Sequence, residues 1–230
     1  PVVSAGMWFP WAIVSLFAVW LVSYLAALLL METNLLYPPG ASFDTFVTDT
    51  LGKAWNTATG LSIAFVLYIL LYAYFSAGGS IVNHTLNSVF SLNTEFSPRA
   101  MSLLFGFTLG SIVWIGTAMV SRLCVVLLGG MVITFLISNS GLMLHVEAAK
   151  LFNANTSESN YFPYLWAALP YFLTSFGCAS LVPSLVKFYG HEPVKIRSCL
   201  LYGTLLSLAV YLIWIFVVFG NVSRINFIPV

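Results

Sequence analysis

The chain has 230 residues, of which 60% are hydrophobic and only 7% carry a charge. Soluble domains carry about 25% charged residues, so this composition excludes an ordinary soluble domain, and the 16% of aromatic residues excludes a disordered chain. A net charge of +1 leaves no basic surface for nucleic acid. We therefore expect an integral protein of a lipid bilayer.

Six segments of the sequence contain no Asp, Glu, Lys or Arg, and each has 20 or more residues. About 20 helical residues cross the hydrocarbon core of a bilayer. Helices are favoured over barrel strands because lipid-exposed backbone must satisfy its own hydrogen bonds and the segments do not alternate apolar and polar residues. The sequence predicts an all-α, polytopic membrane protein with six transmembrane helices, at residues 7–31, 60–82, 100–119, 123–143, 161–186 and 199–219.

The basic residues between these segments indicate the orientation of the chain. Cytoplasmic loops of membrane proteins carry an excess of Lys and Arg. Alternation places five basic residues on one side, which is therefore predicted to be cytoplasmic, and three on the other. The first group is Lys53, Arg122 (in the expected turn between the third and fourth spans), Lys187, Lys195 and Arg197; the second is Arg99, Lys150 and Arg224.

The second predicted span carries a polar stripe. Tyr68, Tyr72 and Ser76 are spaced four residues apart, which places them on one helix face. Polar side chains on a spanning helix usually point into the bundle. The stripe is either one wall of a substrate cavity or a set of hydrogen bonds between helices, and the pattern alone leaves both open.

The fifth predicted span is rich in helix-breaking residues. It holds Pro163, Pro170, Gly177 and Pro183. Pro170 removes a hydrogen bond near Trp166, and Pro183 removes one from the carbonyl of Ala179. We expect the helix to open around residues 175–179, because a helix broken within the membrane is typical of a transporter binding site. An ordinary proline kink is the alternative.

Residues for catalysis are not grouped in the sequence. The three histidines and seven acids lie at span ends or in loops, and the cysteines Cys124, Cys178 and Cys199 match no metal-ligand spacing. We expect no enzyme activity, catalytic residue, metal or cofactor. The thiols are interpreted as small apolar groups within helices.

Four blocks of the sequence together indicate a family: ASFDTFVTDTLGKAWN (41–56), LSIAFVLYILLYAYFSAGGS (61–80), Ser175-Phe176-Gly177 and Val182-Pro183-Ser184-Leu185. In these blocks most densely, the sequence resembles the bacterial tryptophan and tyrosine permeases, the aromatic amino acid permease family of the amino acid–polyamine–organocation superfamily. The resemblance implies a fold of two inverted five-helix repeats, in which the six spans are helices two to seven. We therefore expect residues 1–230 to be one membrane domain fragment that lacks most of helix one and the C-terminal helices.

The resemblance also implies a function and a site. It implies import of tryptophan or tyrosine across the bacterial inner membrane with a coupling ion, for which a proton is expected. The substrate would lie against the broken helix. The implied substrate-binding residues are Ser175, Phe176, Gly177, Cys178 and Ala179, with Tyr72 and Ser76 as weaker candidates.

Two positions depart from the family pattern. After Ser-Phe-Gly, the family has an aromatic residue, His, Gly and a small or amide residue, whereas this chain has Cys178-Ala179-Ser180-Leu181. Where the family carries a Lys in helix five, this chain has Met131, whose thioether cannot hold a proton.

The alternative function is therefore a non-transporting or altered-specificity paralogue, a sensor or structural membrane protein. A membrane-embedded enzyme is disfavoured by the missing acid–base set.

Overall fold

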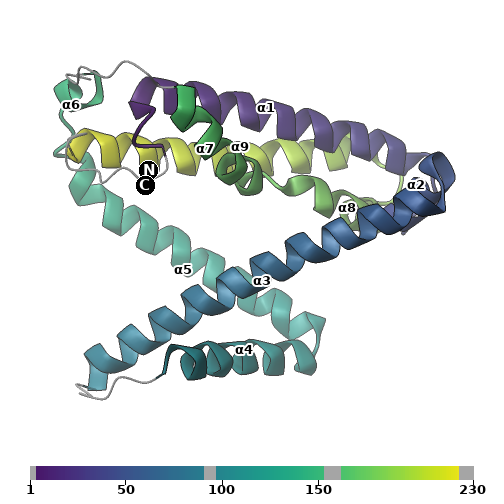
Figure 1. Cartoon of the computed structure of the whole chain (residues 1–230), viewed down its shortest axis with the longest axis horizontal. Coiled ribbons are helices and arrows are strands. Elements are labelled where there is room, and N and C mark those ends of the chain that lie inside the picture. The colour runs from purple at the N-terminus through teal and green to yellow at the C-terminus, as the bar shows by residue number, and fades with distance from the viewer. Residues whose placement is uncertain (1–3, 91–96, 153–161, 223–230) are drawn as a thin grey trace. The chain divides into compact units, whose positions relative to one another are not determined.

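The structure is a computed structural model that describes residues 4–90, 97–152 and 162–222. The described residues form helices joined by short turns, with no strand among them (Figure 1). In chain order the elements are α1 (Trp8–Leu35), α2 (Phe43–Leu51), α3 (Lys53–Phe90), α4 (Pro98–Ile115), α5 (Thr117–Met143), α6 (Ala148–Phe152), α7 (Phe162–Ser175), the 3₁₀ helix η1 (Cys178–Leu181), α8 (Val182–Tyr189) and α9 (Pro193–Asn221).

The six predicted spans are confirmed. Six helical segments of the described chain are long and apolar enough to cross a membrane. They are Trp8–Leu35, Lys53–Ser88, Pro98–Ile115, Ala118–Met143, Tyr164–Tyr189 and Pro193–Asn221. Most helices extend beyond the charge-free segments, because helical hydrogen bonding continues where the chain leaves the apolar layer.

The boundary between the third and fourth spans was predicted wrongly. We expected the third span to reach residue 119 and Arg122 to lie in the following turn, but α4 ends at Ile115 and Arg122 lies within α5. The turn is at Gly116, whose φ of +132° is readily adopted only by glycine. A single glycine inside an apolar run ended the helix where charge placement gave no signal. Arg224, counted in the orientation, lies outside the described residues.

The chain groups into two compact units, which we describe separately. The first consists of Pro1–Asp49 and Phe135–Val230, and the second of Thr50–Thr134. The single membrane domain expected for residues 1–230 stays a prediction.

Helix α1 packs on α7, η1, α8 and α9 in the first unit (Figure 1). Its buried side chains recur every three or four residues, which places them on one face of the helix. The half of α1 near its start packs in a cluster with Phe176, and the half near its end packs with Val182 and Val186 of α8. The buried face of α1 thus supports both halves of the fifth span.

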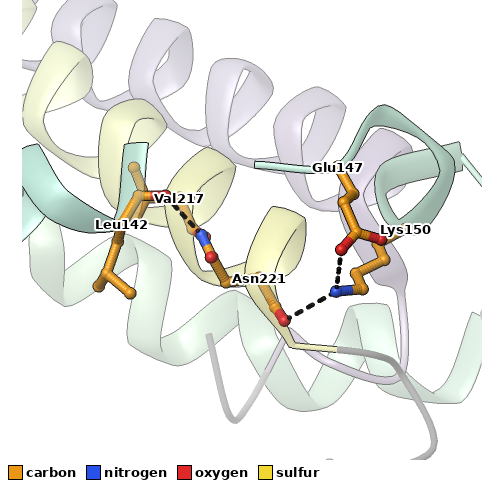
Figure 2. A network of polar contacts seen from close by, with 5 residues as sticks. All are labelled: Leu142, Glu147, Lys150, Val217 and Asn221. Carbon is orange, nitrogen blue, oxygen red and sulfur yellow. Dashed lines mark hydrogen bonds and ion pairs between the residues drawn. The ribbon is translucent and has the colours of Figure 1, made fainter. Parts of the chain in front are cut away.

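Polar contacts join the ends of α5 and α9 to α6 (Figure 2). The side-chain Nδ2 of Asn221 donates to the carbonyl oxygens of Leu142 at 2.9 Å and of Val217 at 2.8 Å. The Lys150 ammonium donates to Glu147 Oε1 at 2.8 Å and to the Asn221 carbonyl oxygen at 3.5 Å. These bonds hold α6 against the end of α9.

The second unit is built on the close packing of α3 and α4. Gly79 of α3 makes this possible, since a Cβ there would lie 2.6 Å from the Cα of Ser102 in α4. Elsewhere α3 carries a large exposed apolar surface, including Leu67, Tyr68 and Tyr72. Such a surface is stable in the apolar interior of a bilayer and not in water.

Candidate functional site

The fifth span is interrupted where the sequence predicted it. Helix α7 ends at Ser175, Phe176 and Gly177 are not helical, and η1 and α8 follow. The prolines act differently from our expectation. Pro170 lies inside α7 without ending it, and Pro183 lies in the first turn of α8, where its missing N–H is not needed.

The interruption leaves peptide groups without partners. Among the described residues, the Gly177 N–H has no acceptor, and the carbonyl oxygens of Thr174 and Ser175 accept no hydrogen bond. The nearby turns are closed by other bonds, from Phe176 N to the Leu173 oxygen at 3.3 Å and from Cys178 N to the Phe176 oxygen at 2.7 Å. One donor and two acceptors are therefore free to bind a ligand.

A cavity of about 460 Å³ lies between this interruption and α9. This volume falls within the range of about 300–1,000 Å³ that is typical of small-molecule sites. Its walls are mostly apolar, with hydroxyl and thiol groups among them. The lining residues are Thr174, Ser175, Phe176, Gly177, Cys178, Leu181, Leu185, Cys199, Leu200, Gly203, Thr204 and Ser207.

The structure brings four of the predicted site residues together. Ser175, Phe176, Gly177 and Cys178 line the cavity, whereas Ala179 is not among its lining residues. Phe176 is buried and packs edge-on against Tyr211 of α9, with ring centroids 5.6 Å apart. Its ring therefore has a fixed position at the end of α7.

The weaker candidates Tyr72 and Ser76 lie in the second unit. Both are on α3, and the side chain of Tyr72 is 70% exposed. They do not line the cavity of the first unit, and their part in a substrate site stays a prediction.

Sequence reasoning missed the contribution of α9. Cys199, Gly203 and Ser207 are spaced four residues apart and, with Thr204, form the wall opposite the interruption. The repeat of small residues was the available signal, because such residues let helices or ligands approach a spanning helix closely. The Thr204 hydroxyl donates to the Leu201 carbonyl at 3.2 Å and that of Ser207 to the Gly203 carbonyl at 3.1 Å, so their oxygens can still accept.

The groups around the cavity are suited to binding a small molecule. No Asp, Glu, Lys, Arg or His lines it, and the described residues contain no group of three or more potential metal ligands. Free peptide groups, hydroxyls and apolar walls can hold a small molecule with both donor and acceptor groups. An interrupted spanning helix beside such a cavity is the arrangement typical of a small-molecule site in a multi-pass membrane protein.

Comparison with known proteins identifies the family. The profile of the tryptophan/tyrosine permease family matches residues 1–230, and the chain belongs to this family. It is a multi-pass protein of the bacterial inner membrane, and its relatives are transport proteins and not enzymes.

Three relatives show the range of similarity. The tryptophan-specific transport protein of Shigella flexneri is 46% identical over 230 residues, covering 100% of this chain and 55% of the relative. The tyrosine permease of Enterobacter agglomerans is 39% identical over 236 residues, covering 100% and 56%. The low affinity tryptophan permease of Escherichia coli K12 is 37% identical over 229 residues, covering 99% and 55%. The chain thus spans about half the length of these relatives, and no solved structure matches it.

Proposed function

We propose that the protein to which this chain belongs imports an aromatic amino acid, tryptophan or tyrosine, and binds it at the interruption between α7 and η1. The observation that carries the proposal is the cavity beside the free N–H of Gly177 and the free carbonyls of Thr174 and Ser175. The names of the relatives supply the substrate class.

An amino acid zwitterion matches these groups. The free carbonyl oxygens are at the C-terminal end of α7, where the helix dipole is negative, so they favour the substrate ammonium. The Gly177 N–H can donate to the substrate carboxylate. Thr204 and Ser207 add hydroxyls on the opposite wall, and the apolar lining, including Phe176, provides a surface for the aromatic ring.

The first test is uptake of radiolabelled tryptophan and tyrosine by cells that express the intact protein in a strain without its own aromatic permeases. Gly177 allows a matched pair of variants. Its φ of −67° suits proline, so Gly177→Pro deletes the N–H, whereas Gly177→Ala keeps it and places a Cβ 3.5 Å from the Thr174 oxygen, an ordinary contact.

We expect Gly177→Pro to lower uptake about tenfold, the effect of losing one hydrogen bond to a charged group, while Gly177→Ala stays close to the unaltered protein. Membrane levels of both variants are measured alongside. Equal uptake by the two variants at equal membrane level would contradict the proposed site.

A second test uses the native cysteines and does not depend on a variant. Cys178 and Cys199 line the cavity, and Cys124 lies on α5 outside it. Saturating tryptophan or tyrosine should slow alkylation of Cys178 and Cys199 in the intact protein and leave Cys124 unchanged, as measured by peptide mass spectrometry. Unchanged alkylation of the cavity thiols would count against the site.

We further propose that the coupling ion is not a proton carried at position 131. Met131 lies on α5, is 62% exposed and cannot hold a proton there. Uptake driven by external acidification is compared between the unaltered protein and Met131→Lys. Proton-driven uptake should be weak in the unaltered protein and gained in the variant. Strong proton dependence of the unaltered protein would overturn this proposal.

The alternative, a non-transporting or altered-specificity paralogue, is favoured by the departure at Cys178-Ala179-Ser180-Leu181 from the family pattern. Uptake distinguishes the two functions. If the protein is a sensor, bound amino acid would protect the cavity thiols from alkylation, but the cells would not accumulate the radiolabelled amino acid.

A further inference from the structure

A second cavity lies at the other end of the first unit, where α1 ends and α9 begins. Its volume is about 340 Å³, and it shares no residue with the cavity at the interruption. We call it the end groove. Its lining residues are Leu28, Met31, Glu32, Leu35, Pro193, Val194 and Arg197.

The end groove contains one acid and one base from different helices. Glu32 comes from α1 and Arg197 from α9, and neither side chain has an ion pair or hydrogen bond with any described residue. The neighbouring charges of α9 are already matched, because Lys195 pairs with Glu192 at 2.6 Å. The groove thus offers one free carboxylate and one free guanidinium.

The position of Glu32 is not explained by helix stability. It lies in the last turn of α1 and is the only charged residue of that helix. The helix dipole disfavours an anion at a C-terminal end, and a charge at the end of a spanning helix loses hydration near lipid. A cationic ligand group in the groove would offset both costs.

The remaining lining is aliphatic. Leu28, Met31 and Leu35 of α1 face Pro193 and Val194 of α9 across the groove, and none of these side chains is aromatic. The groove lies at the ends of two spanning helices, which is where lipid head groups meet the apolar core. Its occupant therefore needs an ammonium for Glu32, an anion for Arg197 and a flexible apolar body.

We propose that the end groove binds a phospholipid whose head group joins a primary ammonium to a phosphate, as in phosphatidylethanolamine. The ammonium pairs with Glu32, the phosphate with the planar guanidinium of Arg197, and the first methylenes of the acyl chains lie on the aliphatic side chains. The proposal does not depend on the substrate assigned to the other cavity.

The test is a lipid competition on the intact purified protein. The protein is equilibrated with equal amounts of phosphatidylethanolamine, phosphatidylcholine and phosphatidylglycerol, and the retained lipid is counted by native mass spectrometry. Phosphatidylcholine has no N–H to donate, and phosphatidylglycerol has no cation. We expect phosphatidylethanolamine to be retained in excess over both.

Glu32→Gln and Arg197→Gln should each lower this preference by roughly three- to tenfold, the range between an exposed ion pair and a hydrogen bond to a charged group. Lys195→Gln is the matched control, since it removes a charge from the same end of α9 but outside the groove, and it should keep the preference. Equal retention of the three lipids by the unaltered protein, or an equal loss in Lys195→Gln, overturns the proposal. Displacement of the lipid by saturating L-tryptophan would assign the groove to the amino acid instead and also overturn it.

Discussion

The indole ring of Trp8 stacks on the phenyl ring of Phe219, with ring centroids 4.8 Å apart and 12° between the planes. Trp8 begins α1, and Phe219 lies in the last turn of α9. The indole Nε1 also donates to the Lys150 carbonyl oxygen at 3.1 Å. One side chain thus links α1, α6 and α9 at the end of the first unit.

Replacing Trp8 should therefore destabilise the first unit. Trp8→Leu keeps an apolar side chain but loses the stacking and the hydrogen bond, and we expect a loss of about 2 kcal/mol in the free energy of unfolding. Trp11→Leu is the control, because the side chain of Trp11 is 49% exposed. Thermal unfolding of the intact protein in detergent measures both, and an equal drop in Tm would contradict the role of Trp8.

Gly79 should be essential for the packing of α3 on α4. In Gly79→Ala the added methyl group would lie 2.6 Å from the Cα of Ser102, so the backbones must separate. We expect a cost of about 1–3 kcal/mol, as for other overpacked cores. Gly60→Ala on the same helix meets no atom within 4 Å, and it should leave stability unchanged or raise it by up to about 1 kcal/mol. The yield of folded protein and its Tm distinguish the two, and comparable values for both variants would argue against a close approach at Gly79.

The amide of Asn221 should matter more than the nearby ion pair. Asn221→Leu removes the bonds to the Leu142 and Val217 carbonyls, at 2.9 and 2.8 Å, and we expect a loss of about 1–3 kcal/mol. Glu147→Gln removes a pair whose side chains are 61% and 32% exposed, and such a pair contributes at most about 1 kcal/mol. Denaturant titration gives both values, and a larger loss in Glu147→Gln would reverse this order.

Thr204 should contribute to substrate affinity from α9. Thr204→Val keeps the shape of the side chain but removes the hydroxyl that lines the cavity, and we expect KM for uptake to rise about three- to tenfold. Thr108→Val is the control, because that hydroxyl, on α4, also bonds its own helix, at 2.8 Å from the Leu104 oxygen. A rise in KM for both variants, or for neither, would remove Thr204 from the site.

The placement of charge was enough to predict the six spans. A charged residue costs several kcal/mol inside a bilayer, so the long segments without charge are the ones expected to lie within the bilayer. Charge placement gives no information inside an apolar run, which is why the turn at Gly116 was missed. The turn depends on a backbone conformation that only glycine adopts readily, and hydrophobicity does not report this conformation.

The interruption near Gly177 was predictable, but the assigned cause was partly wrong. Pro170 is tolerated within α7, and Pro183 starts a helix and does not break one. The helix opens between them, at Phe176 and Gly177, directly after Thr174 and Ser175, whose hydroxyls both donate to the Tyr171 carbonyl. The local sequence was enough to locate the break, whereas the packing of Phe176 against Tyr211 of α9 is a contact between distant segments that the sequence pattern does not predict.

The wall formed by α9 could not have been assigned to the cavity from sequence. Cys199, Gly203 and Ser207 form a pattern that equally describes a tight contact between two helices. Only the arrangement in space shows that this face borders a cavity. A small residue on a spanning helix indicates a close approach, but it does not indicate whether a second helix or a ligand makes that approach.

The cavity at the interruption is lined without any carboxylate, imidazole, amine or guanidinium among the described residues. Substrate affinity there should consequently stay level between about pH 5 and 7, because backbone dipoles and hydroxyls do not titrate in that interval and free thiols ionise only near pH 8.5. A response of uptake to acid would then have to originate elsewhere in the protein, so that substrate recognition and ion coupling would depend on different groups.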